Sequence, residues 1–249
     1  DMYAESLANA LPSRPPEAHR VRRRFDVAEV SSEGPRYLAM AVDIDDGEFQ
    51  ASYTLPGQYV TLGFGETEPR FLVIANAPGE DVDTWEFLVD LDTSLGEALR
   101  DVEPGDDVLL SPAEGSGFPA DEVSERPVLF FTTGSGVAGV RPALQYWSAH
   151  PNQAPPSMAL YYGETAEEDF AYEAEFAEWQ DWGLRLFRAI EELPDPEQGY
   201  RYVQHAFEDH DPSLEHALIF VSGATLMKEL IVGKLLRLGV EPRRIHTNI

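Results

Sequence analysis

Three glycines in "FFTTGSGVAGVRP", residues 130–142, have the spacing G-x-G-x-x-G: Gly134, Gly136 and Gly139. Between a strand and a helix, glycines at this spacing let the backbone approach a pyrophosphate and place its charge at a helix N-terminus. The apolar run "VLFFT" before the motif and the helical pattern after it provide that context. The alternative is a glycine-rich turn that binds no ligand. Because the motif starts past the midpoint of the chain, the first half must form something else.

Composition limits the classes of protein to consider. A chain of 249 residues, 43% of them apolar, fits two domains, and it has neither a bilayer-spanning apolar run nor a visible secretory signal. We therefore expect a soluble, cytoplasmic protein. The absence of cysteine excludes disulfides, thiolate metal sites and iron–sulfur clusters ligated by this chain. The six histidines show no metal-ligand spacing, so no metal is expected and redox chemistry would need an organic cofactor.

The charge is strongly acidic, with 45 acidic residues against 18 basic ones and a formal net charge of −27. Such a surface repels phosphates, which argues against a nucleic-acid partner. The chain contains only two lysines, Lys228 and Lys234, beside this excess of acidic residues. The interpretation we favour is a halophilic adaptation to a salty cytosol, where ions screen the self-repulsion. The alternative is an acidic docking face for a cationic partner.

Six short apolar runs of β type lie between residues 24 and 112, separated by turn signals such as Asp45-Asp46-Gly47 and Pro56-Gly57. Because no long helix intervenes, they predict an antiparallel barrel or sandwich. A short helix, "SLGEALRDV", is expected between the last two strands. The predicted strands are "RFDVAEVS", "YLAMAVDI", "YVTLGF", "FLVIANA", "WEFLVDL" and "DVLLSP".

After residue 126 the rhythm changes. The apolar runs "VLFF", "MALYY", "LRLF" and "ALIFV" recur with helical stretches between them, which is typical of βαβ units and a parallel sheet. The predicted helices are "VRPALQYWSAH", "YEAEFAEWQDW", "GYRYVQHAFED" and "ATLMKELIVGKLLRLG", the last ended by Gly239. We divide the chain into an N-terminal extension at residues 1–22 with a short helix at 3–10, a β-barrel domain at 23–122 and a nucleotide-binding domain at 123–249.

This order of parts resembles the ferredoxin–NADP reductase superfamily. "PGQYVTLGF" and "PRFLVIANAP" are similar to the strands of its flavin site, and "VEPGDDVLLSPAEGSGF" is similar to the end of its barrel. "TGSGVAGVRP", "LYYGE" and "FVSGATLM" occupy the places of its Gly-Thr-Gly-Ile-Ala-Pro loop, its next strand end and its Cys-Gly-x-x-x-Met motif. The resemblance runs from about residue 22 onward and is greatest to the plant-type FAD/NAD(P)-binding oxidoreductase branch, which includes a kiwifruit ripening protein. It implies an N-terminal six-stranded antiparallel Greek-key barrel followed by a C-terminal parallel-sheet nucleotide-binding domain.

The resemblance also implies the site residues. Arg70 stands where the family's arginine holds a flavin phosphate, and Ser222 replaces the cysteine beside the hydride-transfer position. The residues expected at FAD are Arg70, Phe71, Leu72, Val73, Ile74, Asn76, Leu95 and Gly96. Those expected at the nicotinamide dinucleotide are Gly134, Ser135, Gly136, Val137, Ala138, Gly163, Glu164, Gly223 and Met227, with Ser222 as the catalytic candidate.

Departures from the family pattern weaken the flavin site. Leu72 replaces the tyrosine that stacks on the flavin ring, and Val73 replaces a hydrogen-bonding serine, which costs about 0.5–1.5 kcal/mol each. Gly96 stands where a Ser or Thr often touches the flavin pyrophosphate, so backbone N–H groups would have to bind it. The alternative role for Arg70 is a surface ion pair with Glu66 or Glu68.

We therefore expect a flavin-dependent NAD(P)H oxidoreductase, with FAD at the domain junction and an unknown small-molecule or protein acceptor. The alternative is a non-enzymatic nucleotide-binding or scaffold protein that kept the fold while flavin binding weakened, as the changes at Leu72 and Val73 suggest. NADH is expected in preference to NADPH, because Glu164 in "YYGETAEED" would bond the ribose hydroxyls and repel a 2′-phosphate. The counter-argument is that so acidic a chain carries glutamates on many loops.

Overall fold

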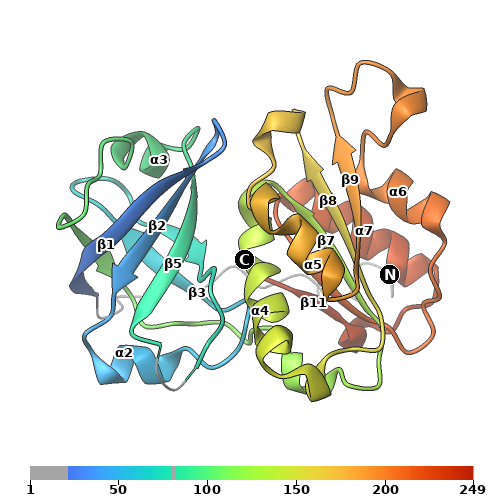
Figure 1. Cartoon of the computed structure of the whole chain (residues 1–249), viewed down its shortest axis with the longest axis horizontal. Helices are drawn as coiled ribbons and strands as arrows, with labels where there is room; N and C mark the ends of the chain where they lie inside the picture. Colours follow the sequence, from blue (N-terminus) through green and yellow to red (C-terminus); the bar gives the residue numbers. More distant parts are fainter. Residues whose placement is uncertain (1–21, 80–81, 249) are drawn as a thin grey trace, which may run out of the picture. The chain divides into compact units, whose positions relative to one another are not determined.

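The computed structural model describes residues 22–79 and 82–248, which form two compact units (Figure 1). One unit contains the described residues up to Ala120 together with Ala138–Tyr146. The other contains Asp121–Val137 and the chain from Trp147 onward. The helix expected at residues 3–10 lies outside the described residues, and the domain boundaries given above stay a prediction.

The first unit is built on a six-stranded antiparallel sheet with the order β4-β3-β6-β1-β2-β5. After β4 the chain turns back to β5, where Ala75 N–H donates to Glu86 O at 2.7 Å, so the two edges of the sheet meet as in the predicted barrel. The strands are β1 (Arg23–Glu33), β2 (Tyr37–Asp43), β3 (Tyr59–Gly63), β4 (Arg70–Val73), β5 (Thr84–Asp90) and β6 (Asp107–Leu110).

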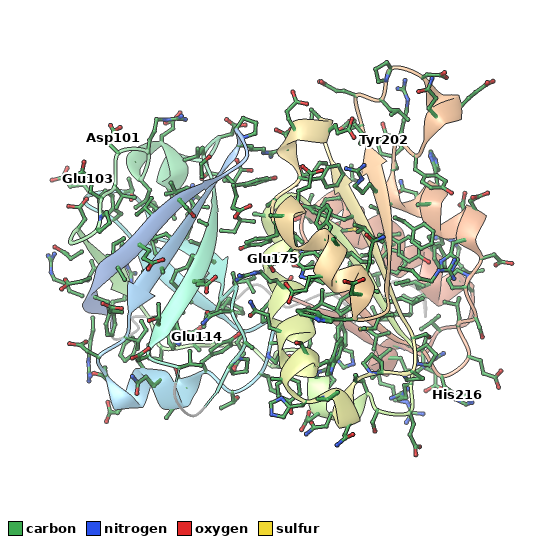
Figure 2. The ribbon with its side chains drawn as sticks, in the orientation of Figure 1. Asp101, Glu103, Glu114, Glu175, Tyr202 and His216 are labelled. Carbon is green, nitrogen blue, oxygen red and sulfur yellow. The ribbon has the colours of Figure 1, made fainter. Side chains whose placement is uncertain are left out.

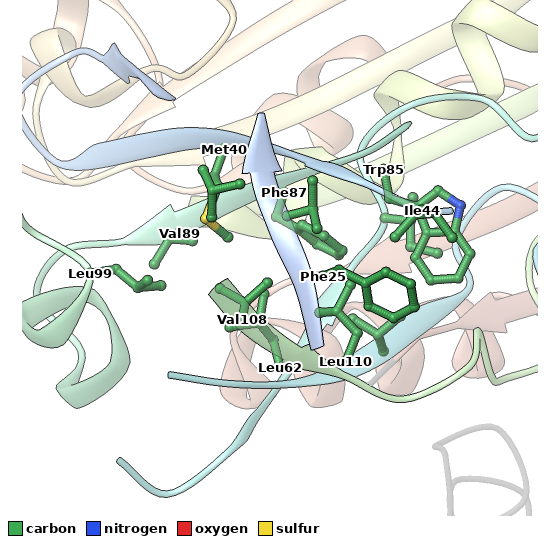
Figure 3. Close-up of a cluster of buried hydrophobic side chains, with 14 of the residues drawn as sticks. Phe25, Met40, Ile44, Leu62, Trp85, Phe87, Val89, Leu99, Val108 and Leu110 are labelled. Carbon is green, nitrogen blue, oxygen red and sulfur yellow. The ribbon is translucent and has the colours of Figure 1, made fainter. Parts of the chain in front are cut away.

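Alternate residues of these strands fill the barrel interior. In β5 Trp85 and Phe87 are fully buried. Thr84, before Trp85, and Glu86, between the two aromatic residues, are only half-buried. Figure 3 shows Phe87 inside the barrel together with Phe25 and Leu110 from two other strands. Burial of such large apolar side chains is the main source of stability for a barrel of this size.

Two helices accompany the barrel, and one of them was missed from the sequence. The Asp45-Asp46-Gly47 segment separates β2 from β3 as expected, but Asp46 also caps a helix, α2 (Gly47–Ser52), which was not predicted. Its carboxylate accepts hydrogen bonds from the N–H groups of Glu48 and Phe49, and this satisfies two N-terminal donors of the helix. The other helix, α3 (Ser94–Ala98), lies within the segment predicted for it.

The second unit is a five-stranded parallel sheet with the order β11-β10-β7-β8-β9. The strands are β7 (Val128–Thr133), β8 (Met158–Glu164), β9 (Leu184–Ile190), β10 (Leu218–Ser222) and β11 (Ile245–Thr247). Four of them coincide with predicted runs, and β11 was not predicted. The strand order reverses between β7 and β10, and ligands of open parallel sheets bind at the carboxyl ends of the strands at such a point.

Helices cover both faces of this sheet. Trp147 of α4 (Arg141–Ala149) packs on Phe130, and Phe176 of α5 (Phe176–Asp181) packs edge-on against Tyr162. The opposite face is covered by α6 (Val203–His210) and α7 (Thr225–Arg237), whose apolar residues join one buried cluster. Gly239 follows Leu238, the C-cap of α7, and has a φ of +85°, as expected for a glycine that ends a helix.

Short 3-10 segments link these elements. One of them, η2 (Gly134–Gly139), contains the glycine motif. The others are η1 (Ala120–Glu122), η3 (Pro151–Gln153), η4 (Glu167–Asp169), η5 (Glu173–Glu175), η6 (Pro196–Gln198) and η7 (Pro242–Arg244).

Acidic side chains project from the surface, as Figure 2 shows for the carboxylates of Asp101 and Glu103. Within the described part of the chain no helix has the length and apolar character needed to cross a bilayer. The same residues contain no group of three or more His, Asp or Glu side chains arranged to hold a metal ion.

Candidate functional site

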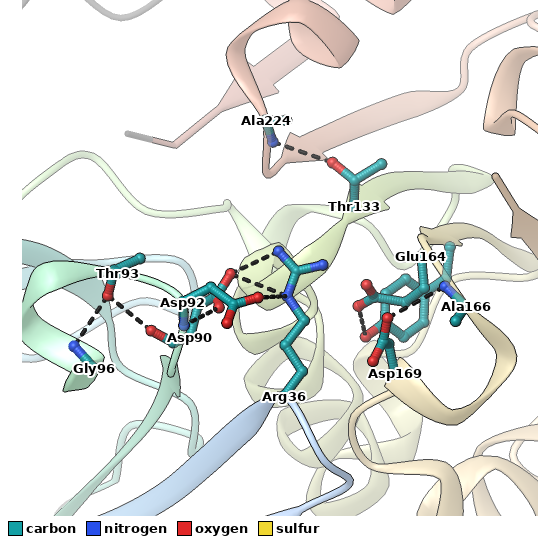
Figure 4. A network of polar contacts seen from close by, with 11 residues as sticks. Arg36, Asp90, Asp92, Thr93, Gly96, Thr133, Glu164, Ala166, Asp169 and Ala224 are labelled. Carbon is teal, nitrogen blue, oxygen red and sulfur yellow. Dashed lines mark hydrogen bonds and ion pairs between the residues drawn. The ribbon is translucent and has the colours of Figure 1, made fainter. Parts of the chain in front are cut away.

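The carboxyl ends of β7 and β10 lie side by side at the point where the strand order reverses. Thr132 pairs with Ser222 across these strands. The loops that follow are tied together, because Ala224 N–H donates to Thr133 Oγ1 at 3.1 Å (Figure 4). This edge of the sheet is where a dinucleotide is expected to bind.

The two loops approach so closely that they require glycine. A Cβ atom on Gly136 would lie 2.7 Å from both the Cα and the N of Gly223. Gly223 has a φ of +120°, and a Cβ there would lie 2.5 Å from Thr133 O. Packing between the loops thus accounts for Gly136 without a ligand. Of the loop residues predicted to bind the dinucleotide, Gly134 and Ser135 are half-buried, whereas Gly136, Val137 and Ala138 are buried.

Glu164, the residue expected at the ribose, is engaged within the protein. It is only 6% exposed, and its carboxylate accepts a hydrogen bond from the Tyr162 hydroxyl at 2.8 Å (Figure 4). Tyr162 is itself held in place, because its hydroxyl accepts the Ala171 N–H at 3.2 Å. Gly163 is buried, and a Cβ there would lie 3.1 Å from Thr133 and Val203 side-chain carbons. Glu164 therefore faces the protein interior instead of a ribose at the surface.

Other acidic side chains are exposed at the same edge. The N–H groups of Glu191 and Glu192 donate to the carbonyl oxygens of Glu164 and Thr165 at 2.9 Å, which places both glutamates beside the end of β8. Their side chains are exposed. Sequence reasoning missed these two residues because it expected the ribose contact after β8. Glu191 and Glu192 follow β9, the neighbouring strand in the sheet.

The acidic segment after β8 is partly neutralised by an arginine that sequence reasoning also missed. Arg188 of β9 pairs with Glu167 at 3.4 Å and with Glu173 at 3.3 Å, and its guanidinium lies 5.4 Å above the ring of Phe170. Asp169 accepts the Ala166 N–H at 3.2 Å. Exposed ion pairs of this kind contribute little to stability, so a bound ligand can displace them at little energetic cost.

The remaining residues predicted on this side are buried. Ser222 is 2% exposed at the end of β10. Met227 belongs to the apolar cluster under α7, with Ile231 and Val232, so its side chain holds the helix on the sheet. A contact of Met227 with the dinucleotide stays a prediction.

On the barrel, Arg70 lies beside the first residue of α3. Its Nη2 is 3.4 Å from Ser94 Oγ and 3.8 Å from Glu68 Oε2, and its side chain is 52% exposed. The ion pair considered from the sequence is thus present, and the guanidinium also reaches a hydroxyl that was not predicted. Both the guanidinium and the hydroxyl are groups that can donate hydrogen bonds to a phosphate.

The residues after Arg70 divide into exposed and structural ones. Phe71 is 42% exposed and contacts Tyr59 edge-on, with ring centroids 5.5 Å apart. Leu72 and Val73 are half-buried, and Ile74 is fully buried in the barrel core. The Ile74 side chain thus serves the barrel core, and a contact of this residue with FAD stays a prediction.

Asn76 is also structural. Its Nδ2 donates to Thr84 O at 2.8 Å and its Oδ1 accepts the Glu86 N–H at 2.9 Å, so the amide joins the end of the flavin motif to β5. These bonds engage both ends of the carboxamide. The side chain thus has a structural role, and a contact of Asn76 with FAD stays a prediction.

The start of α3 differs from the expectation as well. Leu95 is buried in the core, and the Gly96 N–H donates to Thr93 Oγ1 at 3.0 Å (Figure 4). A Cβ on Gly96 would lie 2.1 Å from Asp90 O, so packing requires the glycine. Asp90 is held by Arg36 at 2.8 Å. The Gly96 N–H is thus engaged by the helix cap, and a contact of Gly96 with the flavin pyrophosphate stays a prediction.

Comparisons with known proteins agree with this geometry. Residues 130–232 match the family described as the oxidoreductase NAD-binding domain. The fruit protein pKIWI502 of Actinidia deliciosa is 26% identical over 176 residues, which cover 65% of this chain and 55% of that protein. The anthranilate 1,2-dioxygenase electron transfer component of Acinetobacter baylyi is 33% identical over 118 residues, 46% of this chain and 33% of that protein. The chain thus spans about half of the first relative and a third of the second.

The fold has solved counterparts. A ferredoxin–NADP+ reductase from Neisseria gonorrhoeae, solved with bound FAD and NADP, superposes with a TM-score of 0.72 at 18% identity. The match covers 88% of this chain and 92% of that one. An antiparallel six-stranded sheet followed by a parallel five-stranded one is the architecture predicted from the sequence, and the predicted fold class is confirmed.

Proposed function

We propose that this chain is a flavin-dependent NAD(P)H oxidoreductase of the ferredoxin–NADP reductase-like superfamily. Bound FAD would supply the redox chemistry, taking a hydride from the nicotinamide and passing electrons to a separate acceptor. The observation that carries the proposal is the pair of loops packed at the strand-order reversal, inside the segment that matches the NAD-binding domain family. The task of the protein residues is to bind and orient the two cofactors.

In the dinucleotide half of the site, backbone groups and small side chains would contact the ligand. Gly134 and Ser135 are the accessible residues of the loop, and their backbone would lie against the pyrophosphate. Ser222, at the end of β10, would lie beside the nicotinamide ring, where a small side chain leaves room for a flat ring. In this role Ser222 is a spacer and not a nucleophile.

The residues present on the barrel fit a flavin in part. Arg70 and Ser94 would bind its phosphates, because a guanidinium and a hydroxyl are already 3.4 Å apart there. Phe71 is exposed, but as the residue adjacent to Arg70 in β4 it points to the opposite face of the sheet, so it does not replace the missing tyrosine. Leu72 and Val73 offer no hydrogen bonds, so weaker flavin binding than in most of the superfamily is expected.

NADH is the proposed electron donor. The exposed carboxylates of Glu191 and Glu192 lie at the edge where the adenosine ribose would be bound, and they take the role first expected for Glu164. Carboxylates accept hydrogen bonds from ribose hydroxyls and repel a 2′-phosphate. Arg188 is close by in β9, but it is engaged by Glu167 and Glu173.

The acceptor is proposed to be a separate small molecule or protein. The chain has no cysteine, so it cannot ligate an iron–sulfur cluster of its own. Its relative in Acinetobacter baylyi is an electron transfer component, which supports a protein acceptor. A non-enzymatic nucleotide-binding protein is the second candidate, and Leu72 and Val73 favour it.

Flavin content and reduction distinguish the two functions. The chain is purified, reconstituted with FAD, and mixed with NADH without oxygen while flavin absorbance is followed. Bleaching of the flavin is the expected result. If FAD and FMN both bind more weakly than millimolar, the oxidoreductase function is refuted and the scaffold function remains.

A further inference from the structure

The end of the flavin motif is an irregular segment that other elements hold in place. Residues 74–77, directly after β4, belong to no strand. Ala75 N–H donates to Glu86 O at 2.7 Å, and Asn76 O accepts the Tyr53 hydroxyl at 2.5 Å. Burial, with the charge of Glu86, raises the pKa of Tyr53, so this hydroxyl stays protonated and able to donate. Without a continuous strand ladder, the segment depends on such contacts for its position.

Two further contacts come from α4, the helix that follows the glycine loop. Arg141 Nη1 donates to Ala75 O at 3.0 Å, and Gln145 Oε1 accepts the Ala77 N–H at 2.9 Å. Because Arg141 and Gln145 are four positions apart, they lie on the same face of the helix. One helix face therefore holds two backbone groups of the flavin motif.

Arg141 also makes an ion pair with a strand of the barrel. Its Nη1 lies 2.5 Å from Glu86 Oε2, and the two side chains are 13% and 41% exposed. Salt screens a partly buried pair less than a fully exposed one. Glu86 belongs to β5, in which Trp85 and Phe87 fill the barrel core. Arg141 thus bonds the irregular segment and the regular strand beside it.

The helix α4 is also the direct continuation of the loop proposed to bind the dinucleotide. It begins two residues after Gly139, the last residue of η2. Its Trp147 packs on Phe130 of β7, the strand before that loop, with ring centroids 6.0 Å apart. A helix behaves as a rigid element, so a change at its N-terminus is carried to the side chains of its first turns.

We propose that Arg141 and Gln145 are positioning residues that couple FAD binding to dinucleotide binding, so that each ligand strengthens the binding of the other. The inference rests on the proposed function. A dinucleotide at Gly134 and Ser135 orders the loop and the first turn of α4. FAD then binds a motif whose two anchors are already ordered, and it loses less conformational entropy on binding. Linkage requires the same factor in both directions.

The test measures ADP-ribose binding by calorimetry on the full chain, without FAD and after reconstitution with FAD. The wild-type chain is expected to bind ADP-ribose about fivefold or more tightly when FAD is bound. Arg141→Leu should abolish this difference and leave ADP-ribose binding to the FAD-free chain unchanged. Arg141→Lys keeps a cationic donor and should restore part of the difference.

Gln145→Leu tests the second anchor and covers the case in which Arg141→Leu does not fold. It removes the acceptor of the Ala77 N–H from a half-buried position, and it should reduce the coupling. Gln145→Glu keeps the accepting oxygen and should keep the coupling. Gln180→Leu, at an exposed glutamine, is the matched control and should keep it as well.

Urea denaturation of the FAD-free variants measures the structural contribution of each side chain separately. Folded Arg141→Leu and Gln145→Leu variants that are less stable but keep the wild-type coupling would overturn the inference. So would a wild-type chain that binds ADP-ribose equally well with and without FAD. A wild-type chain that binds neither FAD nor ADP-ribose would instead refute the proposed function.

Discussion

Gly136 and Gly223 are in backbone contact, so that a Cβ atom on Gly136 would lie 2.7 Å from the Cα of Gly223. The second glycine of the motif is therefore explained by the packing of two loops against each other. A substitution at this position changes the fold as well as any bound dinucleotide. The loop residue that can be altered with less structural effect is Ser135, which is half-buried.

Gly136→Ala should lower the free energy of unfolding by about 1–3 kcal/mol, because the added methyl group meets backbone atoms that have no room to move. Urea denaturation with and without ADP-ribose measures it. Gly199→Ala is the matched control: the φ of Gly199 is 173° and its added Cβ would make an ordinary 3.4 Å contact with Leu193. Equal stability of the two variants would contradict the packing explanation.

Arg70→Ala should weaken FAD binding by roughly 1.5–3 kcal/mol, since it removes a charged donor from the phosphate position. Titration of the apoprotein with FAD, followed by flavin fluorescence, gives the affinity. Arg24→Ala removes an exposed arginine that pairs with Asp107 and should leave the affinity unchanged. An Arg70→Ala variant that binds FAD like wild type would remove the arginine from the flavin site.

Replacing Glu191 and Glu192 together with arginine should shift kcat/KM toward NADPH by about tenfold or more. A carboxylate about 4 Å from a phosphate is repelled by about 4 kcal/mol at an effective dielectric of about 20, and screening leaves a fraction of it. The ratio of kcat/KM for NADH and NADPH is measured at low and high salt. Glu164→Gln, which keeps the bond from Tyr162, should leave the ratio unchanged. A shift caused by Glu164→Gln alone would restore the first assignment.

The unfolding free energy should fall as the pH drops below 6.5, the ordinary pKa of histidine. Burial, with a smaller effect of Arg126, lowers the pKa of His246, and burial likewise lowers that of His210. The unfolded chain then binds these protons more readily than the folded one, so stability is present above pH 6.5 and is lost as the pH falls through the lowered pKa values. Urea denaturation at several pH values measures the slope.

His246→Phe should reduce that slope, because it keeps the ring packed on Phe220 and removes the titrating group. His205→Phe, at an exposed position, serves as the control. A pH slope that is the same in His246→Phe and wild type would exclude His246 as a source of acid sensitivity.

The sequence by itself determined which segments become strands and helices and the two kinds of sheet that they form. Trp85 and Phe87 alternate with half-buried residues in a strand of the first sheet, and "VLFF" and "ALIFV" read as continuously buried strands of the second. These patterns are local. A strand with one buried face buries every second residue, and a strand that is covered on both faces buries all of its residues. The resemblance to a known superfamily was likewise contained in short motifs at matching intervals.

Tertiary structure decided which of the matching residues are engaged within the protein. Glu164 bonds Tyr162, Asn76 bonds two backbone groups of β5, and Gly96 packs on Asp90, so all three are engaged within the protein. Arg141 is brought to the carbonyl oxygen of Ala75, 66 residues earlier in the chain, only by folding. The physical reason is that a side chain's burial and hydrogen-bond partners depend on elements far away in the chain, and residue spacing carries no record of them.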